Sequence, residues 1–396
     1  MTAGDGAWEA ISYEERFWSP AADVRDSFSP HLAASGPYRA SVPPFIADLP
    51  VELDADTRSR AHDATSELIR LDAELGRGDS PRAPLLLRAE CAASSAIEHV
   101  TAPALAIMLA DIDESLEPHA LQIVAHVKAD QAALARAGAL DEDAIVHIQR
   151  TLMASTRPDR RGRWRSQQIW IGGGSRGPQR ASFVPPHESR VPALMADLVA
   201  FMKRRDLPPL PQIAIAHAQY ETIHPFLEVN GRTGRAVLQA MLRRSDITRS
   251  VVLPLSTGLL QDTAGYFNAL TRYRAGHISD VVDTMSRAAH TAVATSRVLL
   301  DDLDSIEESW QAQITARQGS AARRLLDLLA RQPALTSRLA VSHLGVSAPN
   351  ALLAIDRLVD DGILSQVGSG RRNRTWVAHD VLRALDALAE RARRQR

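Results

Sequence analysis

Cysteine is almost absent from this sequence. One residue of 396 is a cysteine, Cys91, in the segment AECAASSAIE. A single thiol cannot form an internal disulfide, which agrees with a reducing cytoplasm. Its small, helix-prone neighbours favour a buried core residue over a nucleophile.

Long hydrophobic runs are also absent. No stretch approaches the ~18 apolar residues that a membrane span requires. The N-terminal residues MTAGDGAWEAISYEERFW contain neither a basic start nor an apolar run, so they do not predict a signal peptide. We therefore expect a cytoplasmic protein that does not associate with membranes.

A charge excess is the third absence, because the net charge is −1. This value excludes bulk attraction to nucleic acid or to a membrane, so that such binding would need a local patch. The composition, 45% apolar and 23% charged, is typical of a globular protein. A chain of this length exceeds what one hydrophobic core usually serves, which predicts two or three compact units.

The first 50 residues or so, rich in proline, serine and glycine, lack sustained periodicity and predict an extended arm. After them, hydrophobic periodicity predicts a mainly α protein. The expected helices are 54–75, 85–99, 103–110, 117–137, 141–155, 190–204, 211–223, 231–244 and a long segment from 263 to about 303. Within 161–186, the β-prone runs IWI and ASFV flank GGGSRGPQR and predict a hairpin.

The C-terminal part has a different pattern. Helices are expected at about 320–331, 337–344 and 349–360, followed by GILSQVGSGRRNRTWVA, which predicts strand, turn and strand. This order is typical of a winged helix-turn-helix, with Gly345 to Ser347 as the turn. The expected division is 1–102 for the arm and a helical lead-in, 103–300 for the central core, 301–318 for a helical linker and 319–396 for the winged helix.

The segment HPFLEVNGRTGR, residues 224–235, combines several groups used in phosphate chemistry. Pro225 disfavours helical geometry at His224, so the preceding helix should end there and expose the imidazole. A second helix should start near Gly231, and its first-turn N–H groups and positive dipole end form an anion site. Arg232 and Arg235 add two guanidinium groups to that turn.

Glu228 and Asn230 complete this set. Glu228 is a hard oxygen ligand beside the anion site, as a Mg²⁺ ion bridging to phosphates requires. Asn230 can hydrogen-bond a phosphate oxygen or cap the helix. Each residue alone has an ordinary structural explanation, but their combination within twelve residues indicates a catalytic site.

This segment resembles the catalytic motif of the Fic family, H-P-F-x-[DE]-G-N-G-R-x-x-R, at every specified position except Val229, where the family usually has glycine. The resemblance implies a Fic-type helical core with a β-hairpin flap and a C-terminal winged helix-turn-helix. It implies that His224 is the general base, that Glu228 binds Mg²⁺ and that ATP is the substrate. The implied nucleotide-binding residues are Asn230, Gly231, Arg232, Thr233, Gly234, Arg235, Ile171, Gly172 and Tyr266.

Two of these assignments have alternatives. Tyr266, in GYFNAL, resembles a family tyrosine near the nucleotide, although a packed core aromatic explains it equally well. If position 229 requires a positive φ, a valine there costs roughly 1–2 kcal/mol. If φ is negative, Val229 merely packs.

The segments GRWRSQQIWIGG and ASFVPP resemble the family's flap, which would pair with an extended segment of a target protein by strand addition. Upstream, AECAASSAIEHV resembles the inhibitory pattern [ST]-x-x-x-E-[GN] through Ser94 and Glu98, with His99 where glycine or asparagine is usual. By this resemblance Glu98 pairs with Arg235, and ATP then binds in a pose unsuited to transfer. The alternative is a surface glutamate on an amphipathic helix.

The expected function is a protein adenylyltransferase that transfers AMP from ATP to a Ser, Thr or Tyr hydroxyl of a target protein or of itself. One alternative is a DNA-binding regulator whose Fic-like domain only senses nucleotide. Transfer of another phosphate-containing group and the reverse reaction, removal of AMP, are two more. A homodimer also stays open.

The charged residues of the expected winged helix bear on whether it binds DNA. Three arginines crowd the wing, and three aspartates near the expected recognition helix oppose a DNA backbone. We therefore favour a protein-docking or dimerisation role for this part. The arginines are Arg371, Arg372 and Arg374, and the aspartates are Asp356, Asp360 and Asp361.

Overall fold

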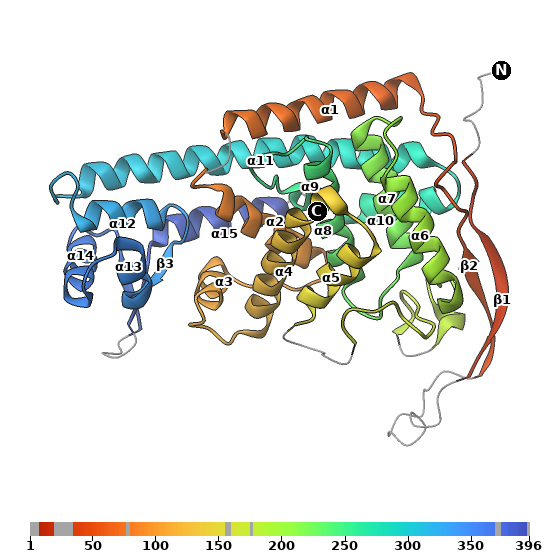
Figure 1. Cartoon of the computed structure of the whole chain (residues 1–396), viewed down its shortest axis with the longest axis horizontal. Helices are drawn as coiled ribbons and strands as arrows, with labels where there is room; N and C mark the ends of the chain where they lie inside the picture. The colour runs from red at the N-terminus through yellow and green to blue at the C-terminus, as the bar shows by residue number, and fades with distance from the viewer. Residues whose placement is uncertain are drawn as a thin grey trace. The chain divides into compact units, whose positions relative to one another are not determined.

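The computed structural model describes residues 8–19, 35–76, 80–154, 160–174, 177–368 and 374–393. Helices make up most of these residues (Figure 1), as the sequence predicts. The chain divides into two compact units. Unit 1 comprises Met1–Thr65, Gln131–Ser245 and Ala264–Ser286; unit 2 comprises Ser66–Asp130, Asp246–Thr263 and Arg287–Arg396. The domain limits expected from the sequence stay predictions.

Unit 1 is built around helix α7 (Pro209–Ile223), in which every residue from Leu210 onward is buried. A helix that is buried on all sides needs neighbours on all sides, and its polar residues need partners within the protein. α7 packs against α6 (Val191–Met202) and α8 (Asn230–Arg244), and α8 also packs against α5 (Glu142–Leu152). This arrangement fixes the loop between α7 and α8, which contains the HPFLEV segment.

Several further elements belong wholly or partly to unit 1. Helices α1 (Ala55–Glu74), α4 (Pro118–Ala135) and α11 (Ile278–Gln313) contribute residues to both units. The expected helix from 263 to 303 is divided into α10 (Thr263–Arg274) and α11, because Gly276 adopts a φ of 91° between them. A positive φ interrupts helical hydrogen bonding, and glycine adopts it at little steric cost.

The described part of the N-terminal segment contains two paired strands. Strands β1 (Ser12–Trp18) and β2 (Gly36–Val42) pair antiparallel, from Ser12 opposite Val42 to Trp18 opposite Gly36. The sequence predicted an extended arm but not the pairing of two of its segments, because that prediction rested on the proline, serine and glycine content of the whole segment. The strands themselves, SYEERFW and GPYRASV, are rich in aromatic and other strand-forming residues.

Among the described residues of 161–186, the expected hairpin forms one antiparallel bridge, between Ile171 and Phe183, in place of two full strands. Gly172, Gly173 and Gly174 follow Ile171 with φ values of 77°, 72° and 59°. Because three successive glycines adopt the left-handed conformation, the chain turns directly after Ile171 and strand pairing ends there. We call residues 167–186 the flap.

In unit 2, helix α2 (Ala83–Ile97) packs against α9 (Leu255–Gln261) and α15 (His379–Arg393). Helix α3 (Ala104–Asp111) also contacts α15. Neither α9 nor α15 was expected from the sequence. None of the helices in the described ranges is long and apolar enough to cross a membrane.

The C-terminal part of unit 2 has three helices and a small sheet. The helices are α12 (Ala321–Leu329), α13 (Ser337–Leu344) and α14 (Ala348–Asp360). The antiparallel sheet has the order β3 (Ala334–Thr336), β5 (Thr375–Val377), β4 (Ser365–Val367), and Gly345 ends α13 with a φ of 64°. Asp356 and Asp360 are exposed on α14, so their charges oppose a DNA backbone. Arg371 and Arg372 lie outside the described residues, and Arg374 stacks on Trp376.

Candidate active site

The candidate site is centred on His224, which lies at the end of α7. α7 ends at Ile223, and His224 is its C-cap with left-handed angles of φ 51° and ψ 63°. The helix end expected from Pro225 is therefore confirmed. The side chain of His224 is 19% exposed, which makes it accessible from one side.

Glu221 orients the imidazole of His224. The Nδ1 atom of His224 lies 3.3 Å from the Glu221 carbonyl oxygen and 3.6 Å from the Glu221 carboxylate. Both neighbouring atoms are acceptors, which favours the tautomer that carries its proton on Nδ1 and its lone pair on Nε2. Glu221 was not predicted from the sequence, although its position three residues before His224 places both side chains on one face of the last turn.

Arg165 holds the end of α7 and was also missed. Its guanidinium donates to the carbonyl of His224 at 2.9 Å, to that of Ile223 at 3.4 Å and to that of Pro186. Its backbone N–H donates to the Pro225 carbonyl at 2.9 Å. A cation at the carbonyl end of a helix stabilises the helix dipole. Burial lowers the pKa of Arg165 to about 10, so it remains charged at neutral pH.

Asn230 closes the loop between the two helices. Its amide oxygen accepts from the Phe226 N–H at 2.8 Å, and its amide nitrogen donates to the Phe226 carbonyl at 2.8 Å. These two bonds fix the loop, and the expected role of Asn230 in nucleotide binding stays a prediction. The Thr233 hydroxyl donates to the Val229 carbonyl at 2.8 Å, so it too holds the backbone of this loop.

Gly234 lets α8 approach α7 closely. A Cβ atom at this position would lie 2.7 Å from both Glu221 Oε1 and Tyr220 Cδ1, closer than side chains pack. Any larger residue would therefore displace Glu221, which orients His224. Gly234 thus has a packing role, independent of its expected role in nucleotide binding.

Arg232 and Arg235 begin α8 together with Gly231, as expected, and both are almost fully buried. The first-turn N–H groups of a helix lack partners within the helix, so this end suits an anion.

Burial and the charge of Arg235 lower the pKa of His217 to about 3, so its imidazole is neutral. His217 Nε2 lies 2.8 Å from the hydroxyl of Tyr266, and the two rings stack, which places Tyr266 in the core of unit 1.

Val229 occupies a strained position. It is the N-cap of α8 with φ 60° and ψ 28°, which is the left-handed conformation. This conformation costs a β-branched residue roughly 1–2 kcal/mol, since its side chain crowds the backbone. The structure thereby selects the first of the two alternatives for this position.

We predict that Val229→Gly leaves the activity of this site unchanged or raises it. Glycine removes the strain of roughly 1–2 kcal/mol but costs roughly 0.5–1 kcal/mol in chain entropy, so the free energy of unfolding should rise by about 0–1.5 kcal/mol. Chemical denaturation measures the free energy of unfolding, and turnover by the purified protein measures the activity. Val229→Ala, which keeps a Cβ, is the matched control. A large loss of activity in the glycine variant would show that the valine side chain has a positive role.

Glu228 lies in the loop and is paired with Arg160. The carboxylate of Glu228 is 2.7 Å from the Arg160 guanidinium, and both side chains are more than one third exposed. One carboxylate oxygen next to an anion site suits Mg²⁺, which keeps several waters and takes phosphate oxygens as further ligands. The residues therefore fit this ion, provided that Arg160 moves away from Glu228.

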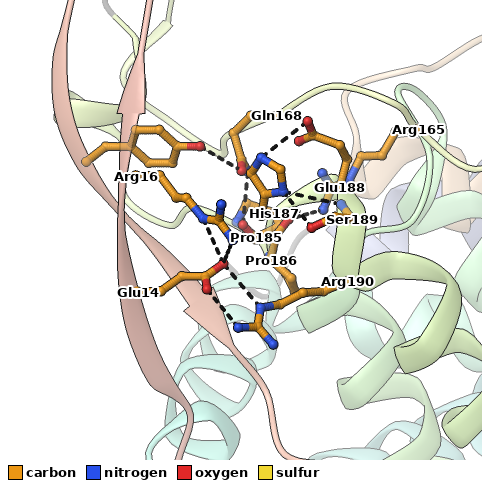
Figure 2. A network of polar contacts seen from close by, with 11 residues as sticks. Glu14, Arg16, Arg165, Gln168, Pro185, Pro186, His187, Glu188, Ser189 and Arg190 are labelled. Carbon is orange, nitrogen blue, oxygen red and sulfur yellow. Dashed lines mark hydrogen bonds and ion pairs between the residues drawn. The ribbon is translucent and has the colours of Figure 1, made fainter.

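Polar contacts join the flap to β2, and join β1 to Arg190, which follows the flap in the chain (Figure 2). The Tyr38 hydroxyl donates to Gln168 at 3.1 Å, and Gln168 donates to the carbonyl of Pro185. Glu14 accepts from Arg190 at 2.7 Å and from Arg16 at 3.0 Å. Hydrogen bonds from both arginines, chiefly Arg190, lower the pKa of Glu14 to about 2.

Apolar and backbone contacts complete this attachment of the flap. The rings of Trp18 and Trp170 meet edge to face, and the Ser41 N–H donates to the Val184 carbonyl at 3.1 Å. Within the flap, Ile171 is 36% exposed and Gly172 is exposed, so both expected nucleotide-contact positions are accessible. The β1–β2 ribbon thus supports the flap.

The expected inhibitory residues belong to α2 in unit 2. Ser94 is fully buried, and Glu98 is the C-cap of the helix. His99 adopts a φ of 63°, which explains why glycine or asparagine suits this position. The pairing of Glu98 with Arg235 stays a prediction.

The arrangement of α7, the motif loop and α8 defines a helical protein with a Fic-type fold. A solved structure of a Fic family protein from Desulfovibrio desulfuricans aligns with 83% of this chain and 97% of its own, at a TM-score of 0.50 and 21% identity. Residues 139–242 match the model of the Fic/DOC family. The chain therefore contains a Fic/DOC domain.

Curated relatives are named protein adenylyltransferase. The protein adenylyltransferase fic-1 of Caenorhabditis elegans is 24% identical over 189 residues, which are 46% of this chain and 34% of the relative. The protein adenylyltransferase Fic of Nematostella vectensis is 25% identical over 154 residues, 38% of this chain and 33% of the relative. The match thus spans about a third of these relatives and supports a transferase activity at the level of the family.

Proposed function

We propose that this protein is an adenylyltransferase that transfers AMP from ATP to a hydroxyl group of a target protein or of itself. The observation that carries the proposal is the geometry at His224. Its Nδ1 faces two acceptor atoms of Glu221, so the tautomer protonated at Nδ1 makes Nε2 the ring nitrogen that can accept a proton. The N-terminus of α8, with Arg232 and Arg235, follows six residues later as an anion site.

In the proposed reaction His224 Nε2 accepts the proton of the attacking Ser, Thr or Tyr hydroxyl. The hydroxyl oxygen forms a bond to the α-phosphorus of ATP, the bond from this phosphorus to the bridging oxygen breaks, and pyrophosphate leaves. Gly231 and the α8 N-terminus bind the α-phosphate region, and Arg232 and Arg235 bind the β- and γ-phosphates. A Mg²⁺ ion bound by Glu228 would supply further neutralisation of phosphate charge.

The substrate hydroxyl would be presented by an extended segment of the target protein along the flap. The flap has one bridge of its own, so its backbone can accept an added strand. In the resting protein, we propose that Glu98 pairs with Arg235 and holds ATP in an unproductive pose.

The test is incubation of the purified protein with ATP and Mg²⁺, followed by mass spectrometry. We expect a mass increase of one AMP on a Ser, Thr or Tyr of the protein itself. Labelled ATP added to a cell extract extends the test to other targets. If neither the protein nor any extract protein gains AMP, including with the Glu98→Gly variant, the proposed function is wrong.

We predict that Arg160→Ala lowers the Mg²⁺ concentration needed for half-maximal nucleotide binding. An exposed ion pair contributes roughly 0.2–1 kcal/mol, so removing the competitor of Mg²⁺ should lower this concentration by a factor of about 1.4 to 5. Titration of Mg²⁺ at fixed ATP, with nucleotide binding as the signal, measures the change. Arg161→Ala is the control, because Arg161 is exposed and donates to the Ala154 carbonyl. A higher requirement in Arg160→Ala would instead indicate that Arg160 binds the phosphates.

A further inference from the structure

A buried group of metal-binding side chains lies between α2 and α4. Cys91 and Ser95 come from α2, and His126 and Asp130 come from α4. In each pair the residues are four positions apart, so they lie one turn above each other on the same helix face. All four side chains are buried, with relative exposures of 0% or 1%. The proposed reaction uses none of them.

Two distances within this group are close to those between neighbouring ligands of a tetrahedral zinc ion. The Sγ atom of Cys91 lies 3.5 Å from Asp130 Oδ2, and His126 Nε2 lies 3.5 Å from the other carboxylate oxygen, Asp130 Oδ1. One ligand atom from each of the three residues lies within 4.8 Å of the other two. Zinc bonds of about 2.3 Å to sulfur and about 2.0–2.2 Å to nitrogen and oxygen place tetrahedral neighbours roughly 3.3–3.7 Å apart.

The charges of the group also suit a divalent cation. A thiolate, a carboxylate and a neutral imidazole together offset the charge of Zn²⁺, so the occupied site would be neutral. Neutrality matters because an uncompensated charge is costly in a buried environment.

We propose that Cys91, His126 and Asp130 form a zinc site that joins α2 to α4. Sulfur, nitrogen and oxygen donors together favour zinc over Mg²⁺ or Ca²⁺, which prefer oxygen alone. The Ser95 hydroxyl, 3.3 Å from His126 Nδ1, orients the imidazole as an outer partner. The three protein ligands leave one coordination position for water.

The test loads the full chain, freed of metal by a chelator, with zinc chloride and removes unbound ion by desalting. We expect about one zinc per chain by elemental analysis and a higher midpoint of thermal unfolding. Cys91→Ser keeps the size of the side chain and should lower zinc affinity at least tenfold. His119→Ala, on α4 but exposed and outside the group, is the matched control and should retain the metal.

Cobalt in place of zinc gives a second measurement. A thiolate-to-cobalt absorption band should appear in the unmodified protein and disappear in Cys91→Ser, with circular dichroism to confirm that the variant folds. If the unmodified chain retains no zinc after loading, or if folded Cys91→Ser retains as much as the unmodified chain, the proposal is wrong. The group is then a hydrogen-bonded network without metal. Neither result depends on AMP transfer.

Discussion

His224→Ala should lower AMP transfer by about 10²–10⁴-fold, the usual contribution of a general base. The loss should be in the rate and not in folding, since His224 lies beyond the end of α7 and its side chain is 19% exposed. Incorporation of labelled AMP measures the rate of transfer. Thermal unfolding followed by circular dichroism measures whether the variant folds.

The control for this variant is another histidine of unit 1 outside the loop. His147 lies on α5 and is half-buried, so His147→Ala should transfer AMP at the rate of the unmodified protein. A folded His224→Ala protein with undiminished transfer would exclude His224 as the base.

Glu98→Gly should raise self-modification by roughly ten- to a hundredfold, because a charged hydrogen bond contributes about 1.5–3 kcal/mol. Arg235→Ala should not raise it. Both changes delete the proposed ion pair, but only Glu98→Gly keeps a guanidinium for the γ-phosphate. The two variants should therefore diverge when AMP incorporation is compared at equal ATP concentration.

Two controls separate this effect from a general loosening of the helix end. Glu98→Gln removes the charge and keeps the length of the side chain, so it should also activate. Glu114→Ala changes an exposed glutamate between α3 and α4 and should have no effect. If Glu98→Gly and the unmodified protein modify themselves equally, the autoinhibition proposal fails while the role of His224 is untouched.

Much of the helical fold follows from local sequence patterns. α7 and α8 were predicted within two residues of their limits because each has a strong local signal, such as Pro225 at the end of α7. The pairing of β1 with β2 was not predicted, since it joins strands separated by a long connection. Sequence composition reports on local preference and not on such partners.

The candidate site was also predicted in part, because the motif identifies residues but not the contacts they make. The motif located His224 and Glu228, which have the expected places in the loop. It did not reveal that the Asn230 amide binds Phe226 or that Arg160 pairs with Glu228, because these contacts depend on how the loop folds back on itself. Glu221 was within reach of sequence reasoning, since it is one helical turn before His224.

The attachment of the flap to the N-terminal ribbon has a consequence for the protein during its synthesis. Tyr38 and its partner Gln168 are 130 residues apart. At about 5–20 residues per second, the ribosome adds Gln168 roughly 6–26 seconds after Tyr38. During this interval Trp18 and Tyr38 have no flap to pack against, so the nascent ribbon exposes aromatic side chains to which a chaperone can bind. The flap, in contrast, emerges when its support has already been made.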